Sequence, residues 1–326
     1  MRHFSTIIRP CFNFLLSARS LVMLRRISLL LIGVMFWFNQ MACAWAETTE
    51  DLTDLPIEEL LNVEILNASR SGQNVSTAPA SISVLTASDI RAFGWRTLAE
   101  AMNAMRGIFS VNDRNYSYLG VRGFWHSNDY SSRILLAIDG QRMNDNAFDG
   151  SYYGQEFLLD MDLIERIEFI PGSGSSVYGT NAFLGMINVV TKNGQALNGA
   201  QVSGEAGSYD SYKGRFSYGK KLANNLDVLL SGSYFDSAGV PNLYFREFDS
   251  PETNNGIAQN LDSESAQRLL ARVQYHDLTL TAGYVDRFKQ VPTAAYNAIF
   301  NDPGFFTVDK RFFTAAKYQT PISEVS

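Results

Sequence analysis

Histidine and cysteine, the residues used most often for metal binding and nucleophilic chemistry, are few in this chain and far apart. The histidines are His3, His126 and His276, and the cysteines are Cys11 and Cys43. This spacing gives no metal-ligand pattern. The sequence also lacks a G-x-S-x-G turn and an H-E-x-x-H helix. We therefore expect no catalytic residue, no resident metal and no cofactor.

A glycine-rich stretch at residues 172–180, GSGSSVYGT, is a second candidate for chemistry, because stacked backbone N–H groups can bind phosphate. However, it lacks the lysine of a phosphate-binding loop, and Tyr178 stands where a small residue is needed. We interpret the stretch as a tight turn in which glycines adopt positive φ and Tyr178 packs the loop down. Asp139, followed by Gly140, is likewise interpreted as a turn residue and not as a catalytic acid.

The first 46 residues have the pattern of an export signal. They contain five arginines and no acid, an apolar core at 27–38, and the small-x-small site Ala44-Trp45-Ala46. Twelve apolar residues fall short of the roughly 20 that a membrane-spanning helix requires. The mature chain is predicted to begin at Glu47, with Met1 or Met23 as the initiator. Removing the leader lowers the formal net charge from −6 to −11, which argues against a nucleic-acid partner.

From Gly199 onward, short runs alternate apolar and polar residues with period two. Between 226 and 236, Leu226, Val228 and Leu230 share one face, opposite Asp227 and Ser231. An exported protein that crosses a membrane without helices needs a closed barrel, which has lipid outside and a polar interior. We predict about six strands, at 200–208, 211–220, 226–236, 267–276, 278–287 and 310–319. The short connections 221–225 and 276–277 are predicted to be periplasmic, and the long connections 237–266 and 288–309 extracellular. A soluble antiparallel sheet is the alternative.

Residues 47–196 predict a mixed α+β domain ahead of these strands. Polar and apolar periodicity indicates short elements joined by Gly and Asp turns. The expected elements are a marginal helix at 51–61, a strand at 81–86, a helical turn capped by Ser88, a helix at 98–105, and a strand at 133–138 that returns through 141–143.

Residues 164–192, IERIEFIPGSGSSVYGTNAFLGMINVVTK, resemble the plug domain of TonB-dependent outer-membrane receptors. Two more segments agree with that family's pattern, namely Val121-Arg122-Gly123-Phe124 and LAIDGQRM at 136–143. The matching positions of the main motif are Glu165, Arg166, Ile167, Glu168, Pro171, Gly172, Tyr178, Gly179, Asn181, Ala182, Gly185, Ile187, Asn188, Thr191 and Lys192.

The resemblance implies an α+β plug domain followed by antiparallel strands of an incomplete transmembrane β-barrel. The predicted division is a signal peptide (1–46), a periplasmic segment (47–80), the plug (81–196) and the first strands (197–326). Barrels of this family have 22 strands, so about 16 are missing here. We expect the N-terminal part of a longer receptor, or a truncated gene product, in the outer membrane of a Gram-negative bacterium.

The resemblance also implies roles for individual residues. Arg122 and Arg166 are the candidates for contacts between plug and barrel. The TonB-binding segment is assigned to Val63, Glu64, Ile65, Leu66 and Asn67, and the expected partners are TonB, outer-membrane lipid and a ferric siderophore, without nucleic acid. Cobalamin, haem or an oligosaccharide are alternative ligands, and a non-transporting plug-type binding module is an alternative function. The candidate ligand contacts are Phe124, Trp125, His126, Tyr130, Phe148, Tyr152 and Tyr153.

Overall fold

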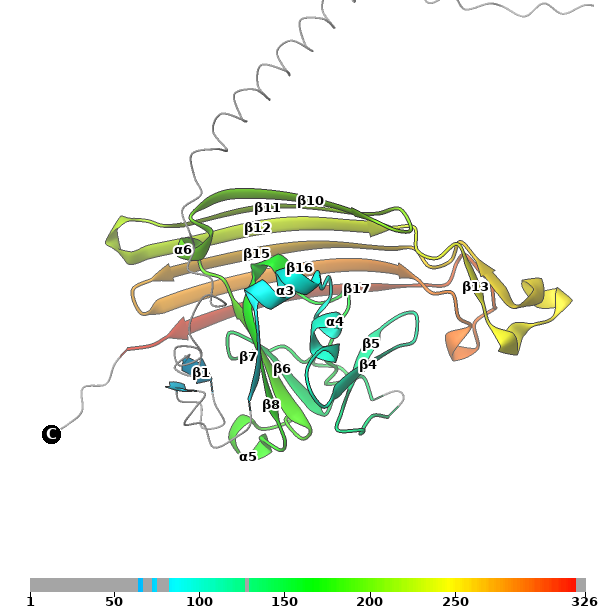
Figure 1. Ribbon diagram of the computed structural model, residues 1–326, viewed down its shortest axis with the longest axis horizontal. Coiled ribbons are helices and arrows are strands. Elements are labelled where there is room, and N and C mark those ends of the chain that lie inside the picture. The colour runs from blue at the N-terminus through cyan, green and yellow to red at the C-terminus, as the bar shows by residue number, and fades with distance from the viewer. Residues whose placement is uncertain (1–63, 67–71, 75–81, 127–128, 321–326) are drawn as a thin grey trace, which may run out of the picture. The chain divides into compact units, whose positions relative to one another are not determined.

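The computed structural model describes residues 64–66, 72–74, 82–126 and 129–320, which all belong to one compact unit, Asp51–Ser326. Within this unit a mixed α/β domain, here called the plug-like domain (residues 82–197), precedes a broad sheet of long strands (Figure 1). The predicted leader and the helix expected at 51–61 lie outside the described residues.

The plug-like domain is built on a five-stranded sheet with the order β3-β8-β9-β6-β7. Strands β6 and β9 pair in parallel, and the other neighbours are antiparallel. The sequence of β6, ILLAI, is buried on both faces, as expected of a central strand covered on two sides. The predicted hairpin at Asp139-Gly140 is confirmed. The bounds are β3 (Ser83–Thr86), β6 (Ile134–Ile138), β7 (Gln141–Arg142), β8 (Ile164–Pro171) and β9 (Gly185–Thr191).

The glycine-rich stretch is a turn between β8 and β9, as predicted, and contains the short helix α5 (Ser175–Tyr178). Gly172 and Gly179 have φ values of 102° and 81°, a region that favours glycine. Tyr178 packs against a small cluster that includes Leu135 and Met186. The ring therefore holds the turn against the sheet.

Two helices and a hairpin complete the plug-like domain. Helix α3 (Ala87–Phe93) begins directly after β3, and helix α4 (Leu98–Asn103) ends two residues before its predicted limit. Ser88 was the wrong cap: Thr86 is the N-cap, because its hydroxyl accepts from the Asp89 N–H while the Asp89 carboxylate accepts from the Thr86 N–H. Strands β4 (Ile108–Asn112) and β5 (Ser117–Val121) form a separate hairpin.

The six predicted long strands are confirmed and form one antiparallel sheet, here called the strand wall, in the order β10-β11-β12-β15-β16-β17. Each strand pairs with the next along its length. Strands β10 and β17 are its two edges, so the sheet is open. The bounds are β10 (Gly199–Gly207), β11 (Ser211–Lys221), β12 (Leu226–Ser237), β15 (Glu264–Tyr275), β16 (Leu278–Gln290) and β17 (Phe306–Tyr318).

The two faces of the strand wall differ as the period-two pattern predicts. In β12 the face with Asp227, Leu229 and Ser231 is buried, while Leu230 on the other face is 47% exposed. Leu229, Leu270 and Val285 join the hydrophobic core of the plug-like domain. The inner face is thus covered by this domain, and the outer face presents an apolar surface of the kind that lipid covers.

Connections at the two ends of the strand wall differ in length (Figure 1). One end has the short links η4 (Ala223–Asn225) and His276-Asp277. The opposite end has a long connection that contains β13 (Asn242–Tyr244), η5 (Arg246–Phe248), η6 (Pro251–Gly256) and β14 (Ile257–Gln259). A small core unites this connection with Phe300 of the β16–β17 link, whose ring stacks on Phe248 at 4.3 Å. No helix among the described residues is long and apolar enough to cross a membrane.

Candidate functional site

The β4–β5 turn is fastened to the strand wall by Arg287 of β16, which is only 2% exposed. The Arg287 Nε lies 2.6 Å from a Glu264 carboxylate oxygen, and Nη1 lies 2.9 Å from Asp309. Toward the plug-like domain, Arg287 donates to the Asn115 carbonyl and lies over the Tyr116 ring at 5.4 Å. The Tyr116 hydroxyl donates to Asp309 over 2.8 Å. One wall cation therefore joins two wall carboxylates to the backbone of the neighbouring domain.

Glu156 of the plug-like domain is buried beside this arginine, with 3.7 Å between Glu156 Oε2 and Arg287 Nε. Its other oxygen, Oε1, accepts from the N–H groups of Tyr153 and Gly154. Burial raises the pKa of Glu156 above its ordinary value, and the nearby Arg287 only partly offsets this effect.

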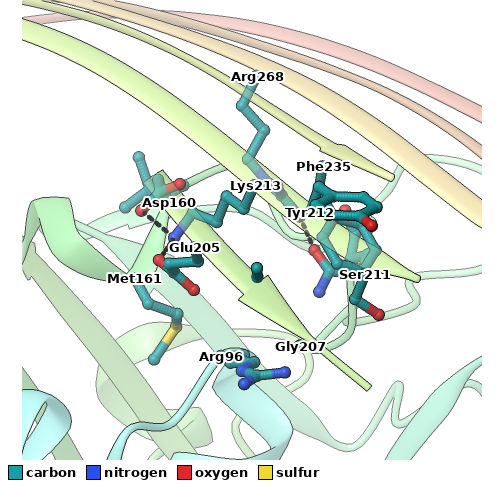
Figure 2. A pocket seen from close by; sticks show the side chains of 13 residues that line it. Arg96, Asp160, Met161, Glu205, Gly207, Ser211, Tyr212, Lys213, Phe235 and Arg268 are labelled. Carbon is teal, nitrogen blue, oxygen red and sulfur yellow. Dashed lines mark hydrogen bonds and ion pairs between the residues drawn. The ribbon is translucent and has the colours of Figure 1, made fainter. Parts of the chain in front are cut away.

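A second ionic cluster joins the start of η3 (Met161–Leu163) to β11 (Figure 2). Lys213 Nζ lies 3.0 Å from both Asp160 and Glu205, and Arg215 Nε lies 3.3 Å from Asp162. Burial alone would raise the pKa of Asp160, but Lys213 outweighs it and the pKa is lowered. Asp160 therefore stays ionised at neutral pH.

A third contact lies where the plug-like domain joins the wall, at α6 (Gly194–Leu197). Asp227 of β12 accepts from the Gly194 and Gln195 N–H groups over 2.7 and 2.9 Å. A Cβ added to Gly194 would lie 2.1 Å from the Val228 carbonyl oxygen, so only glycine fits this approach. The linker backbone is therefore packed directly on the wall.

The strand wall supplies most of the cations in these contacts. Besides Arg287, they include Lys213, Arg215, Arg268, Arg272 and Arg311, which bind plug-like carboxylates or carbonyls. The two arginines predicted for this role are placed differently. Arg122 is exposed on the loop after β5, and Arg166 pairs with Glu165 and Glu168 on its own strand at 2.9 and 2.8 Å. Their assignment to plug–barrel contacts remains a prediction.

Aromatic side chains gather at the long-connection end. Tyr130 stacks on Phe148 at 5.3 Å, and Tyr118 lies 6.3 Å from Tyr130 between ring centroids. The hydroxyls of Tyr130 and Tyr296, which lies in the β16–β17 connection, are 2.9 Å apart. This hydrogen bond, together with burial, raises the pKa of Tyr130 to about 12. We call Tyr118, Tyr130, Phe148 and Tyr296 the apical aromatic group. Phe148 and Tyr296 are 64% and 81% exposed, so both rings are accessible to solvent.

The loop that carries Phe148 is held in shape by its own polar groups. Asp145 accepts from the backbone N–H groups of Ala147, Phe148 and Gly150. Burial opposes ionisation of Asp145, but these hydrogen bonds prevail and its pKa is lowered. Buried Asn144 donates to the Ile134 carbonyl. Phe148 is therefore presented by an ordered loop.

The structure separates the remaining predicted ligand residues. Phe124, Trp125 and His126 are exposed on the loop after β5. Tyr152 is half-buried under Arg311, whose guanidinium lies 4.8 Å from the ring centroid. Tyr153 is fully buried in the hydrophobic core and offers no surface to a ligand in this conformation.

A polar cavity of about 510 Å³ lies between the plug-like domain and the wall at the same end. Its lining includes Arg114, Glu156, Asp262 and Arg287. The volume falls in the range of pockets that hold small molecules. Among the residues that the structure describes, no group of three His, Cys, Asp or Glu side chains could hold a metal ion.

The predicted TonB-binding segment is only partly described. Glu64, Ile65 and Leu66 form β1 (Glu64–Leu66), which pairs antiparallel with β2 (Gly72–Asn74). Val63 and Asn67 lie outside the described residues. The assignment of this segment to TonB binding stays a prediction.

A small mixed domain pinned by ion pairs to the inner face of long strands, whose outer face is apolar, is typical of a plugged outer-membrane barrel. A family model described as the TonB-dependent Receptor Plug Domain matches residues 74–186. Residues 74–186 are therefore similar to the plug domain of TonB-dependent receptors, and antiparallel strands follow this domain in the chain.

Individual relatives agree with this assignment. The chain is 27% identical over 204 residues to a vitamin B12 transporter, BtuB, of Vibrio vulnificus, covering 62% of this chain and 31% of the relative. It is 30% identical over 135 residues to an iron-regulated outer membrane virulence protein of Vibrio cholerae, covering 40% of this chain and 20% of that protein. The chain therefore spans less than a third of the length of either relative.

The fold is also similar to that of FpvA of P. aeruginosa, solved in complex with heterologous pyoverdines. The TM-score is 0.51 at 18% identity, and the match covers 69% of this chain and 27% of FpvA. At this identity the comparison concerns the fold alone.

Proposed function

We propose that this chain supplies the plug and six barrel strands of an outer-membrane receptor that imports a ferric siderophore in a TonB-dependent manner. The observation that carries the proposal is the apical aromatic group, in which exposed rings from the plug and from a wall connection are joined by the Tyr130–Tyr296 hydrogen bond. Exposed aromatic rings on an ordered loop suit the flat, partly apolar surface of a metal chelate. The adjacent cavity has room for a small ligand.

The proposed mechanism involves no covalent chemistry. The ligand contacts Phe148 of the plug and Tyr296 of the wall at the same time. This binding changes the position of the plug relative to the wall at the long-connection end. The segment around Glu64–Leu66 then pairs with TonB by strand addition, as extended peptides commonly do, and proton motive force moves the plug. We place the receptor in the outer membrane of a Gram-negative bacterium, as the names of its relatives suggest.

Cobalamin is the second candidate ligand. It is favoured by one observation, namely that the longer of the two sequence matches is to a protein named as a vitamin B12 transporter. Both ligands are metal chelates, and the aromatic group suits either. Direct measurement of uptake distinguishes them.

The test of function is uptake by the bacterium that carries the gene. We expect deletion of the gene to abolish accumulation of radioactive iron supplied as a ferric siderophore, and to leave uptake of cobalamin labelled with radioactive cobalt unchanged. The opposite pattern would identify a cobalamin receptor. Unchanged uptake of both would contradict import as the function.

Binding by the chain itself can be measured by quenching of tryptophan fluorescence in detergent, with ferric catecholate and ferric hydroxamate siderophores as probes. Phe148→Ala should weaken binding about tenfold, as expected when a central aromatic contact is removed. Phe183→Ala is the matched control, because Phe183 is 62% exposed but belongs to the β8–β9 turn. Equal effects of the two substitutions would contradict the apical site.

A further inference from the structure

A second cavity, of about 300 Å³, lies at the short-connection end of the strand wall. It is bounded by plug residues near the β6–β7 turn and by the ends of β15, β16 and β17. Three cations line this cavity, namely Arg166, Arg272 and Lys317, and we call the cavity the basic pocket. Asp139 is the one carboxylate among the lining residues, and its oxygens accept from the N–H and hydroxyl of Thr191. The lining therefore carries an excess of positive charge.

Two of the three cations lack an anionic partner within the described part of the chain. Arg166 is balanced by Glu165 and Glu168. Arg272 donates from Nη1 to the Lys192 carbonyl over a long 3.4 Å, and its buried Nε has no hydrogen-bond partner. No ion pair of Arg272 or Lys317 occurs among the described residues.

A buried N–H group without an acceptor costs free energy, and native structures rarely leave one unpaired. Polar side chains that can donate hydrogen bonds, among them Gln274, Thr279 and Gln319, line the same cavity as Arg272 and Lys317. Arginine binds carboxylates through paired N–H groups, so a carboxylate placed in the cavity would satisfy the Nε donor and balance the charge together. The basic pocket is therefore built for an acidic ligand.

The chain itself contains a fitting ligand. Residues 51–59, DLTDLPIEE, carry four acids and no base, and they precede the plug. They lie outside the described residues, 24 positions before the first residue of β3. Because Glu64 pairs with Asn74, the β1–β2 hairpin itself adds only about 5 Å to the reach. The five steps before the hairpin and the nine after it bring the total to about 50 Å when extended, whereas the 13 residues of β17 span about 43 Å. The stretch can therefore reach the end of the wall where the basic pocket lies.

We propose that the basic pocket is a carboxylate-binding site occupied by residues 51–59 of the same chain. The contact would hold the neighbouring strand Glu64–Leu66 at the short-connection end, so that any partner recruiting this segment must compete with Arg272 and Lys317. The inference goes beyond the proposed uptake function and does not depend on it, because it concerns only contacts within this chain.

Carbodiimide cross-linking of the purified chain in detergent micelles tests the proposal. The reagent joins a carboxylate to the Lys317 amine as an amide and takes up the water that is released. Mass spectrometry should find Lys317 linked to residues 51–59 in preference to Lys221, an exposed lysine near the other short connection. The variant Arg272→Gln should lower the yield about fivefold, which is the effect of one lost ion pair.

A second variant guards against misfolding of the wall. Replacing Asp54, Glu58 and Glu59 with the corresponding amides leaves every strand residue unchanged and keeps Asp51 as the one acid of the segment. Because the segment then binds the basic pocket more weakly, the cross-link between Asp51 and Lys317 should also decrease. Inorganic phosphate should compete and lower the yield of the unmodified chain. Three results would overturn the proposal. The first is an equal yield of cross-links from Lys317 and from Lys221, and the second is a Lys317 yield that Arg272→Gln does not change. The third is protection of Lys317 by phosphate when no cross-link to residues 51–59 is found. The last would mean that the pocket takes a free anion.

Discussion

Arg287→Met is the substitution that most directly tests how the plug is held. Arg287 contacts Glu264 and Asp309 at 2.6 and 2.9 Å, and also binds the Asn115 carbonyl. Methionine fills similar space but leaves two wall carboxylates together and a carbonyl without its donor. Removing one partner of a buried ion pair costs about 3–5 kcal/mol, and Arg287 is only 2% exposed, so little solvent screening reduces this value. We expect the plug to be destabilised by that amount.

Equilibrium unfolding by guanidinium, followed by tryptophan fluorescence, measures the effect. A chain beginning at Glu47 retains only Trp95 and Trp125, both in the plug, so the emission reports this domain. Lys310→Met is the control, because Lys310 pairs with Asp286 on the outer face, where its side chain is 61% exposed. It should change the midpoint little.

A further variant distinguishes the loss of the Arg287 ion pairs from the cost of leaving buried carboxylates without a cation. Combining Arg287→Met with Glu264→Gln and Asp309→Asn removes the two uncompensated wall carboxylates and should restore much of the lost stability. If Arg287→Met costs no more than Lys310→Met, the role of Arg287 in fastening the plug is refuted.

Three other substitutions test the remaining contacts. Gly194→Ala places a Cβ 2.1 Å from the Val228 carbonyl oxygen and should lower the free energy of unfolding by about 3 kcal/mol or more in the same assay. The control Gly204→Ala has open space around the added Cβ and should change it by no more than about 0.5 kcal/mol. Equal costs for the two substitutions would contradict the close approach at Gly194. Asp227→Asn should cost about 1–2 kcal/mol, because a charge-assisted pair of hydrogen bonds to the Gly194 and Gln195 N–H groups is weakened, and an unchanged midpoint would count against it. Glu156→Gln should flatten the pH dependence of plug unfolding: since the folded state raises the pKa of Glu156, its stabilising contribution is complete below the unfolded-state pKa and is lost as pH rises through the folded-state pKa. A variant with the same pH profile as the parent would show that Glu156 does not titrate in this way.

The strands were predictable because period two is local information. All six lie within a few residues of the expected ranges, since one face of each strand is mainly apolar. The same alternation places Lys213, Arg268 and Arg287 on the opposite face, so the sequence predicts that these side chains lie on the inner face of the wall. Their partners were not, because an ion pair such as Lys213–Asp160 joins residues far apart in the chain.

The apical end was less predictable for the same reason. Strands β13 and β14 have three residues each, too few to give a periodic signal, and they are ordered by Phe300 from another connection. Tyr130 and Phe148 were expected to serve one site, and they do stack. The sequence groups Tyr153 with them, because aromatic residues on polar loops look alike in sequence, whether they end in the core or at the surface.

The position of β3 sets how the plug responds to mechanical load. β3 is an edge strand with only four residue pairs to β8, and it is the first long-range pairing in the chain after residue 82. Tension applied to the preceding chain acts first on these four pairs. The buried strands β8, β9 and β6 carry load only after β3 detaches, and at the other end α6 remains fixed to the wall by Asp227. Under tension the plug should therefore unfold in steps that begin at β3, and the first step should need much lower force than the later ones.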